Sequence, residues 1–219
     1  MPTNSYYSRK QQLVSVFEDT MERVKQSPDL TIATNLSIQN QQFIPEATEI
    51  QKSEANKHNQ PAKIIVSRLR SFEAAAQYIG KRTAVLNFAS ATNPGGGVEK
   101  GASAQEECLC RVSTLYPCLA DQKMRASFYT PHRKNGNTLH NDDIIYTPNV
   151  LVIKDDDHNL LSEPFSVDII SCADLTCAND HPINTTQVIL SKCKYRTMNY
   201  LFCMRNERER FFHLPLPMV

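Results

Sequence analysis

The sequence of 219 residues has no tryptophan and only six glycines, and no glycine follows Gly136. It also lacks an excess of either charge, because 24 Lys and Arg side chains face 23 Asp and Glu. A formal net charge of +1 gives no general attraction for a polyanion, so we expect no direct nucleic-acid binding. No apolar run reaches the roughly 20 residues of a membrane span, and no basic segment with an apolar core opens the chain. These absences predict an intracellular protein without membrane association.

Metal-binding patterns are also lacking. The seven cysteines include no Cys-x-x-Cys pair, and they fall inside predicted helices or beside apolar strands. Free buried thiols are therefore expected rather than a zinc site. The run Asp155–Asp157 lacks the alternating Asp-x-Asp-x-Asp-Gly pattern of a calcium loop and predicts a hairpin turn instead. We expect neither a metal nor a cofactor.

The chain is long enough for one domain with a sizeable core, and 41% of its residues are hydrophobic. We predict that residues 1–62 form an N-terminal helix and a polar connection packed on the domain. Within them, apolar residues at spacings of three and four indicate an amphipathic helix over residues 8–26. Residues 63–203 are predicted to form the core, and residues 204–219 an irregular tail.

Alternating apolar strands and helical patterns predict an α/β fold in which helices flank a mixed sheet. We expect strands at 64–66 and 83–90, joined by a helix over 71–79 in a βαβ unit. A β-prone run precedes them at 30–37. The next helix is predicted from about 102 to 115.

The second half of the core is predicted from shorter patterns. Residues 117–143 read as loop, and a strand over 144–153 is interrupted by Pro148. A polar hairpin turn over 154–159 and a buried strand over 167–170 follow. The last predicted element is a helix over 185–203.

The most informative stretch lies between residues 83 and 107. After the predicted strand come Asn93-Pro94 and three successive glycines, then a seven-residue gap and Gln105-Glu106-Glu107 at the start of a helix. Glycines let the backbone approach a ligand closely, and a Gly-rich turn presents N–H groups suited to a diphosphate. Adjacent carboxylates are suited to acid–base or glycosidic chemistry. The spacing matches neither a dinucleotide-binding fingerprint nor a Walker loop.

This combination resembles the signature of poly(ADP-ribose) glycohydrolases. The wider stretch Leu86–Tyr116 is similar to the microbial-type branch of that family, and the resemblance extends from about residue 10 to about residue 200. It implies a macrodomain-like fold with an N-terminal helical extension. It also implies an enzyme that releases ADP-ribose from poly(ADP-ribose) on modified proteins and needs no metal.

The resemblance implies a role for each residue of the stretch. Glu107 would be the general acid that protonates the departing ribose oxygen, and Glu106 would hold ribose hydroxyls. Either Asn87 or Asn93 would bind a ribose hydroxyl, and the glycines would let the distal ribose and diphosphate lie against bare backbone. The implied substrate-binding residues are Gly95, Gly96, Gly97, Asn87, Asn93 and Gln105.

The C-terminal part differs from the family pattern. The family continues with another strand, a second Gly-rich loop that closes over the diphosphate and a final helix. The absence of glycine after Gly136 excludes such a loop, and Pro215 and Pro217 argue against a terminal strand or helix. We therefore expect an atypical, truncated C-terminus. Two alternatives stay open: a degenerate macrodomain that binds ADP-ribose without cleaving it, and an inactive remnant that serves only association.

Overall fold

The structure is a computed structural model that describes residues 3–48, 65–135, 141–173, 200–205 and 209–215. The strands form one six-stranded sheet in the order β1-β3-β4-β2-β5-β6. The strands are β1 (Gln42–Ile44), β2 (Thr83–Ala89), β3 (Ile144–Lys154), β4 (Leu160–Ala173), β5 (Tyr200–Arg205) and β6 (Glu209–Pro215). The helices are α1 (Thr3–Gln26), α2 (Pro28–Asn40), α3 (Ser71–Ala76), α4 (Gln105–Val112), α5 (Leu115–Leu119), α6 (Gln122–Met124) and α7 (Thr130–Asn135). A 3-10 turn, η1 (Val98–Lys100), and a π-helical turn, η2 (Arg125–Tyr129), complete the set.

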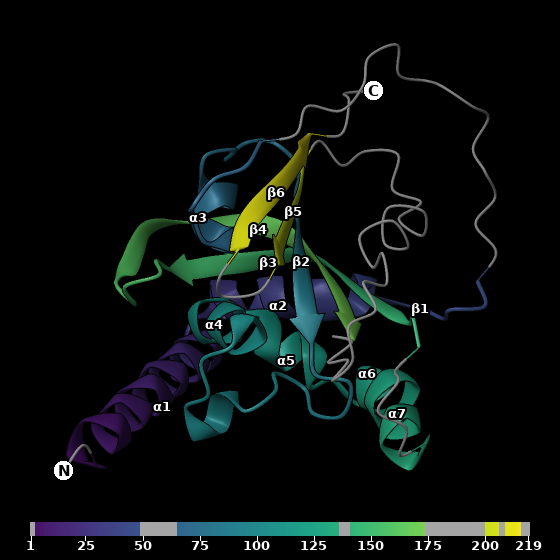
Figure 1. Cartoon of the computed structure of the whole chain (residues 1–219), viewed down its shortest axis with the longest axis horizontal. Coiled ribbons are helices and arrows are strands. Elements are labelled where there is room, and N and C mark those ends of the chain that lie inside the picture. Colours follow the sequence, from purple (N-terminus) through teal and green to yellow (C-terminus); the bar gives the residue numbers. More distant parts are fainter. Residues whose placement is uncertain (1–2, 49–64, 136–140, 174–199, 206–208, 216–219) are drawn as a thin grey trace.

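The sheet is mixed, which confirms the predicted α/β class. β2 runs parallel to its neighbours β4 and β5, whereas β1–β3, β3–β4 and β5–β6 are antiparallel. Figure 1 shows α4 and α5 directly below the sheet, near the end of β2, and α1 extending away toward the N-terminus. The central strand β2 therefore ends where α4 begins.

The hairpin between β3 and β4 forms as predicted. Its turn is closed by a 2.9 Å hydrogen bond from Asp155 N to Asn159 O, and the Asp155 carboxylate accepts the N–H of Asn159 at 2.8 Å. Pro148 interrupts the β3–β4 register as expected, because the pairing shifts between Thr147 and Val150.

The predicted β-prone run at 30–37 is wrong, because these residues belong to α2. The Ser27 side chain accepts a hydrogen bond from Leu30 N at 3.4 Å, and Pro28 occupies the first helical position. A serine cap, a proline at the first position and Asp29 in the first turn together start a helix. These local start signals outweigh the β preference of the following residues.

The loop-rich stretch predicted for residues 117–143 is wrong up to residue 135, because α5, α6, η2 and α7 occupy most of it. Residues 136–140 lie outside the described residues, and 141–143 belong to no helix or strand. Pro117 is the third residue of α5, within the first turn, where a proline is tolerated. Asp121 starts α6 by accepting the Lys123 N–H at 3.0 Å.

Two further elements differ from prediction. Ile64 of the strand predicted at 64–66 lies outside the described residues, Ile65 makes only an isolated bridge and Val66 joins no strand. The described parallel partners of β2 are β4 and β5. Most of the helix predicted over 185–203 lies outside the described residues, but its end is strand β5. Part of the predicted irregular tail is strand β6, whose proline is its last residue.

The core has two layers, divided by the sheet. One cluster joins alternate strand residues such as Val85 and Ile169 to Phe17 of α1, Phe72 of α3 and Leu109 of α4. The other consists, in the described part of the chain, of strand residues on the opposite face, including Leu86 of β2. The predicted N-terminal helix is thus part of the main core. Among the described cysteines, Cys110 and Cys118 are free and buried, as expected, Cys108 is free and half-buried, and Cys172 is buried.

Candidate active site

A sharp glycine turn connects β2 to η1. Gly95 and Gly96 have φ values of 68° and 58°, which disfavour other residues. A Cβ on Gly95 would lie 2.7 Å from Cδ2 of Tyr116, and one on Gly96 would overlap the Glu107 carboxylate. A Cβ on Gly97 would lie 2.9 Å from that of Ala102. Close packing therefore requires glycine at all three positions, and backbone conformation requires it at two.

The two glutamates of α4 hold this turn. Glu107 Oε1 accepts the N–H of Gly97 at 2.8 Å, and Glu106 Oε2 accepts the N–H of Ser90 at 2.7 Å. Both carboxyl groups also come close to Gly96, because a Cβ there would lie 3.2 Å from Glu106 Oε2 and 3.1 Å from Glu107 Cδ. The sequence pattern predicted this pairing of a glycine turn with two carboxylates, and the structure brings them together.

Both glutamates are buried, with exposures of 3% for Glu106 and 7% for Glu107. Burial raises the pKa of Glu106 to about 8, and the charge of Glu107 adds to the shift, although the Ser90 N–H opposes it. At neutral pH the pair therefore holds a proton. One oxygen of each, Glu106 Oε1 and Glu107 Oε2, is buried and has no hydrogen-bond partner among the described residues. Such oxygens are suited to contact a bound molecule.

The N–H groups of the turn are largely used inside the protein. Gly96 N donates to Asn93 O at 2.9 Å, while Gly97 N donates to Glu107. The turn thus offers a ligand a surface without side chains rather than a row of free N–H donors. This differs from the expectation that the turn presents backbone N–H groups to a diphosphate.

Gln105 contacts the sheet rather than the turn. Its Nε2 donates to Leu86 O at 2.6 Å, and its Oε1 accepts the N–H of Phe88 at 2.8 Å. In the described part of the chain, β5 pairs with β2 at residues 83–85 only. The Gln105 amide thus supplies a donor and an acceptor to β2 beyond the last of these pairs. A contact from Gln105 to a substrate stays a prediction.

The two asparagines occupy different environments. Asn87 is fully buried in β2, where its Nδ2 donates to Ser171 Oγ at 3.0 Å and its Oδ1 has no partner in the part of the chain that the structure describes. Asn93 is exposed in the turn, and its side chain donates to Thr92 Oγ1 at 3.2 Å. The unpaired buried acceptor favours Asn87 as the residue that contacts a ligand.

Sequence reasoning assigned no role to Tyr116, although it lies in the stretch that resembles the family. Its ring packs against Gly95 and meets Phe17 of α1 edge to face, with centroids 4.9 Å apart. Its hydroxyl donates to Glu99 of η1. Burial and the neighbouring Glu99 raise its pKa to about 12, so the phenol stays protonated. Tyr116 therefore forms the wall behind the glycine turn.

Arg111 was also missed by sequence reasoning. It is 1% exposed, and its guanidinium donates to Ala102 O and, at 3.7 Å, to Cys108 Sγ. Ala102 N in turn donates to Gly97 O at 3.1 Å. Arg111 thus holds the returning arm of the glycine loop from behind.

The described residues contain neither a cluster of metal ligands nor a membrane-spanning helix. In them, no group of three or more His, Cys, Asp or Glu side chains is arranged to hold a metal ion. Nor does any helix within the described ranges combine the length and apolar character that a membrane span needs.

Known proteins resemble this chain closely enough to place it. The family model described as the catalytic domain of microbial-type PARG, a poly(ADP-ribose) glycohydrolase, matches residues 6–155. The crystal structure of poly(ADP-ribose) glycohydrolase from Thermomonospora curvata is 24% identical, with a TM-score of 0.76 over 87% of this chain and 78% of that chain. The same enzyme bound to the inhibitor ADP-HPD gives a TM-score of 0.67 at 24% identity, over 87% and 77% of the two chains.

A second bacterial enzyme is also similar. Poly(ADP-ribose) glycohydrolase from Deinococcus radiodurans, in complex with ADP-ribose, is 26% identical with a TM-score of 0.52. That match covers 72% of this chain and 65% of the other. A comparison with curated protein sequences gave no match.

Proposed function

The chain belongs to the family of microbial-type poly(ADP-ribose) glycohydrolase catalytic domains, and on this basis we propose that it hydrolyses ribosyl O-glycosidic bonds and releases ADP-ribose. The observation that carries the proposal is the pair of buried carboxyl groups on α4, each tied to the backbone on one side of a glycine turn. We propose poly(ADP-ribose) on modified proteins as the substrate.

The reaction requires a proton for the departing ribose oxygen and stabilisation of an oxocarbenium-like transition state. We assign the proton transfer to Glu107, whose Oε2 is free while Gly97 N fixes its Oε1. Glu106 contacts ribose hydroxyls through its free Oε1. After the bond breaks, the deprotonated carboxylate takes a proton from the attacking water, which restores the starting state.

The proton comes from the glutamate pair itself. The raised pKa of Glu106 keeps a proton on that carboxyl group at neutral pH, where an exposed pair of carboxyl groups would have lost both. Both carboxyl groups lie close to Gly96, and we propose that this proton passes from Glu106 to Glu107 before the ribose oxygen departs. The burial that retains this proton also excludes water, and electrostatic interactions are stronger in such a site. The same environment therefore supplies both the acid and the electrostatic stabilisation.

Substrate binding follows from the shape of the turn. We propose that the distal ribose and diphosphate lie against Gly95, Gly96 and Gly97, where no side chain intervenes. Asn87 Oδ1, which has no partner within the described ranges, accepts a hydrogen bond from a ribose hydroxyl. We keep Gln105 among the proposed binding residues, with an indirect role. Its amide bonds Leu86 O and Phe88 N and so fixes the β2 backbone on either side of Asn87.

The test combines calorimetric titration of ADP-ribose with a hydrolysis assay on poly(ADP-ribose). We expect the wild-type chain to bind ADP-ribose and to release it from the polymer. Glu107→Gln should reduce turnover at least about a hundredfold with little change in Kd, because amide and carboxyl groups have similar shapes. Turnover that survives in Glu107→Gln but is lost in Glu106→Gln would reverse the two roles.

The wild-type titration separates the other functions. Binding without turnover would show a module that recognises ADP-ribose only. If the folded chain shows neither binding nor turnover, both the enzyme and the binding module are contradicted. A protein that serves only association is then left.

A further inference from the structure

Helix α1 lies directly behind the proposed site. Gly101, which closes the glycine loop with φ 72°, packs so tightly against α1 that a Cβ there would lie 2.5 Å from Lys10 O. Phe17 of α1 meets the ring of Tyr116, which in turn packs on Gly95. The helix therefore contacts both the closing residue and the wall of the loop.

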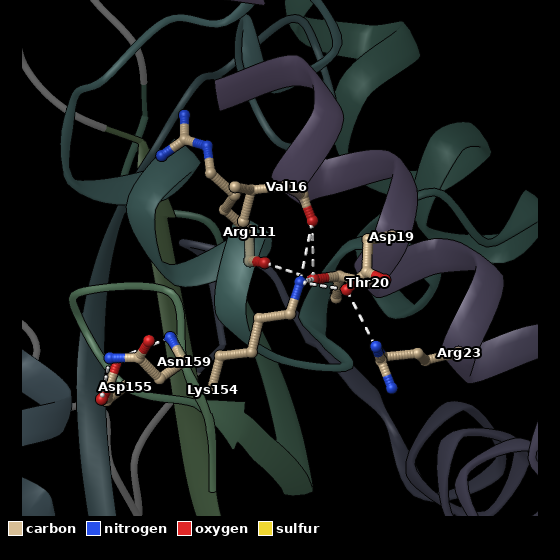
Figure 2. Close-up of polar contacts among 8 residues, drawn as sticks. All are labelled: Val16, Asp19, Thr20, Arg23, Arg111, Lys154, Asp155 and Asn159. Atoms are coloured by element: carbon tan, nitrogen blue, oxygen red, sulfur yellow. Dashed lines mark hydrogen bonds and ion pairs between the residues drawn. The ribbon is translucent and has the colours of Figure 1, made fainter. Parts of the chain in front are cut away.

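A buried lysine anchors α1 at this position. Lys154, the last residue of β3, is only 3% exposed, and its Nζ lies 2.7 Å from Asp19 Oδ2, 2.8 Å from Thr20 Oγ1 and 3.0 Å from Val16 O. Figure 2 shows the ammonium group pointing into α1 between these three acceptors. An ammonium has three hydrogens, so α1 alone accounts for all of them. Burial of such a charge is unfavourable without this complete set of partners.

Lys154 also directs the hydroxyl of Thr20. This hydroxyl lies 3.0 Å from Val16 O in its own helix and 2.6 Å from Arg111 O in α4. It has a single hydrogen, and Lys154 competes for Val16 O because it donates both to Thr20 Oγ1 and to Val16 O. The contact from Thr20 to Arg111 O is the shorter of the two, and Figure 2 shows it beside the ammonium.

The bond to Arg111 O fixes an otherwise free end of α4. The last four carbonyl groups of a helix have no partner inside it, and Arg111 is the penultimate residue of α4. A helix of eight residues is not stable by itself, so its orientation depends on such contacts. At its other end, α4 carries Glu106 and Glu107.

We propose that Thr20 and Lys154 are positioning residues for the glutamate pair, acting through Arg111 and helix α4, and that α1 thereby sets the alignment of the proposed catalytic site. This inference rests on the proposed glycohydrolase function. Thr20 and Lys154 touch neither glutamate, and their effect is to hold α4 so that both carboxyl groups meet the glycine turn.

The first test is Thr20→Val, which removes the hydroxyl and keeps nearly the same shape. We expect kcat to fall about tenfold at a temperature where circular dichroism shows a folded protein, with the Kd for ADP-ribose unchanged within about twofold. Thr20→Ser should restore most of kcat because it restores the hydroxyl. Lys154→Met should lower kcat by a smaller factor, since the hydroxyl of Thr20 then divides between Val16 O and Arg111 O.

Arg23→Ala is the matched control. Arg23 also pairs with Asp19, at 2.8 Å, but its side chain is 42% exposed, whereas that of Lys154 is 3% exposed. We expect wild-type kcat from this variant. A folded Thr20→Val protein with wild-type kcat would overturn the proposal and leave these bonds a purely structural role.

Hydrogen exchange tests the positioning role of Thr20 even if the wild-type chain does not hydrolyse the polymer. The amides of Gly97 and Ser90 donate to the two glutamates, so misaligned carboxyl groups should let them exchange about fivefold faster or more in Thr20→Val. The amide of Ile169 in the core should keep its protection. Unchanged exchange at Gly97 and Ser90 would overturn the proposal independently of any activity.

Discussion

Glu107 and Gly97 are joined by a 2.8 Å hydrogen bond from the glycine N–H to Oε1 of the carboxylate, across ten residues of chain. This bond fixes one oxygen of Glu107, while its Oε2 is buried without a hydrogen-bond partner among the described residues. It exists because the glycine turn lets the backbone approach the carboxylate without a side chain between them. The glycines are therefore needed for the geometry of the acid as well as for a ligand.

Gly96→Ala tests this relationship. Its φ of 58° strains any other residue, and the added Cβ would collide with the Glu107 carboxylate. We expect a loss of about 1–3 kcal/mol in stability and a Kd for ADP-ribose raised at least about tenfold. Gly80→Ala is the control, because its φ of 84° brings the same strain while a Cβ there meets nothing within 4 Å. Equal effects of the two substitutions on Kd would contradict the prediction.

The raised pKa of Glu106 predicts a pH-dependent stability. A carboxyl group with its folded pKa at about 8, above the ordinary 4.5, favours the folded state below pH 4.5 and loses that contribution as the pH rises toward 8. Glu106→Gln cannot ionise, so its stability relative to wild type should increase between pH 5 and pH 8.5. The expected gain at pH 8.5 is on the order of a few kcal/mol.

Chemical denaturation at the two pH values measures this difference. Glu18→Gln, on the exposed face of α1, is the matched control and should show no such trend. A constant difference between Glu106→Gln and wild type at pH 5 and pH 8.5 would mean that Glu106 is already ionised in the folded protein.

Gln105→Glu tests the contact between α4 and β2. The new carboxylate still accepts the N–H of Phe88, but it places an oxygen where Nε2 donated to Leu86 O at 2.6 Å. A lost donor that faces a buried carbonyl costs about 1–3 kcal/mol. We expect that loss in urea unfolding, together with lower turnover, because α4 carries both glutamates. Gln12→Ala, at an exposed position of α1, should change neither, and unaltered turnover in Gln105→Glu would separate this contact from the site.

The centre of the site was predictable from sequence because its parts are close together in the chain. A strand, three glycines and two glutamates lie within residues 83–107, and local spacing determines how they meet. β2 and α4 formed where the apolar pattern placed them. The same reasoning failed at α2, where a β-prone composition concealed the start signal Ser27-Pro28-Asp29.

Contacts between distant residues could not be predicted in this way. Lys154 binds Thr20 across 134 residues, and neither belongs to a recognisable motif. A lysine at the end of an apolar strand looks like an ordinary exposed charge until the fold buries it against α1. The burial that raises the pKa of Glu106 likewise depends on tertiary packing rather than on its neighbours in the chain.

Tyr116 allows the ring and the hydroxyl of one wall residue to be tested separately. Its ring packs on Gly95 and Phe17, whereas its hydroxyl reaches only the exposed Glu99 among the contacts described above. Tyr116→Phe keeps the ring, so we expect the Kd for ADP-ribose to stay within about twofold, since an exposed hydrogen bond contributes little. Tyr116→Ala removes the wall behind the glycine turn and should weaken binding about tenfold or more and lower stability by about 3–5 kcal/mol. Calorimetric titration of both variants measures the difference, and equal affinities would show that the glycine turn keeps its shape without the ring.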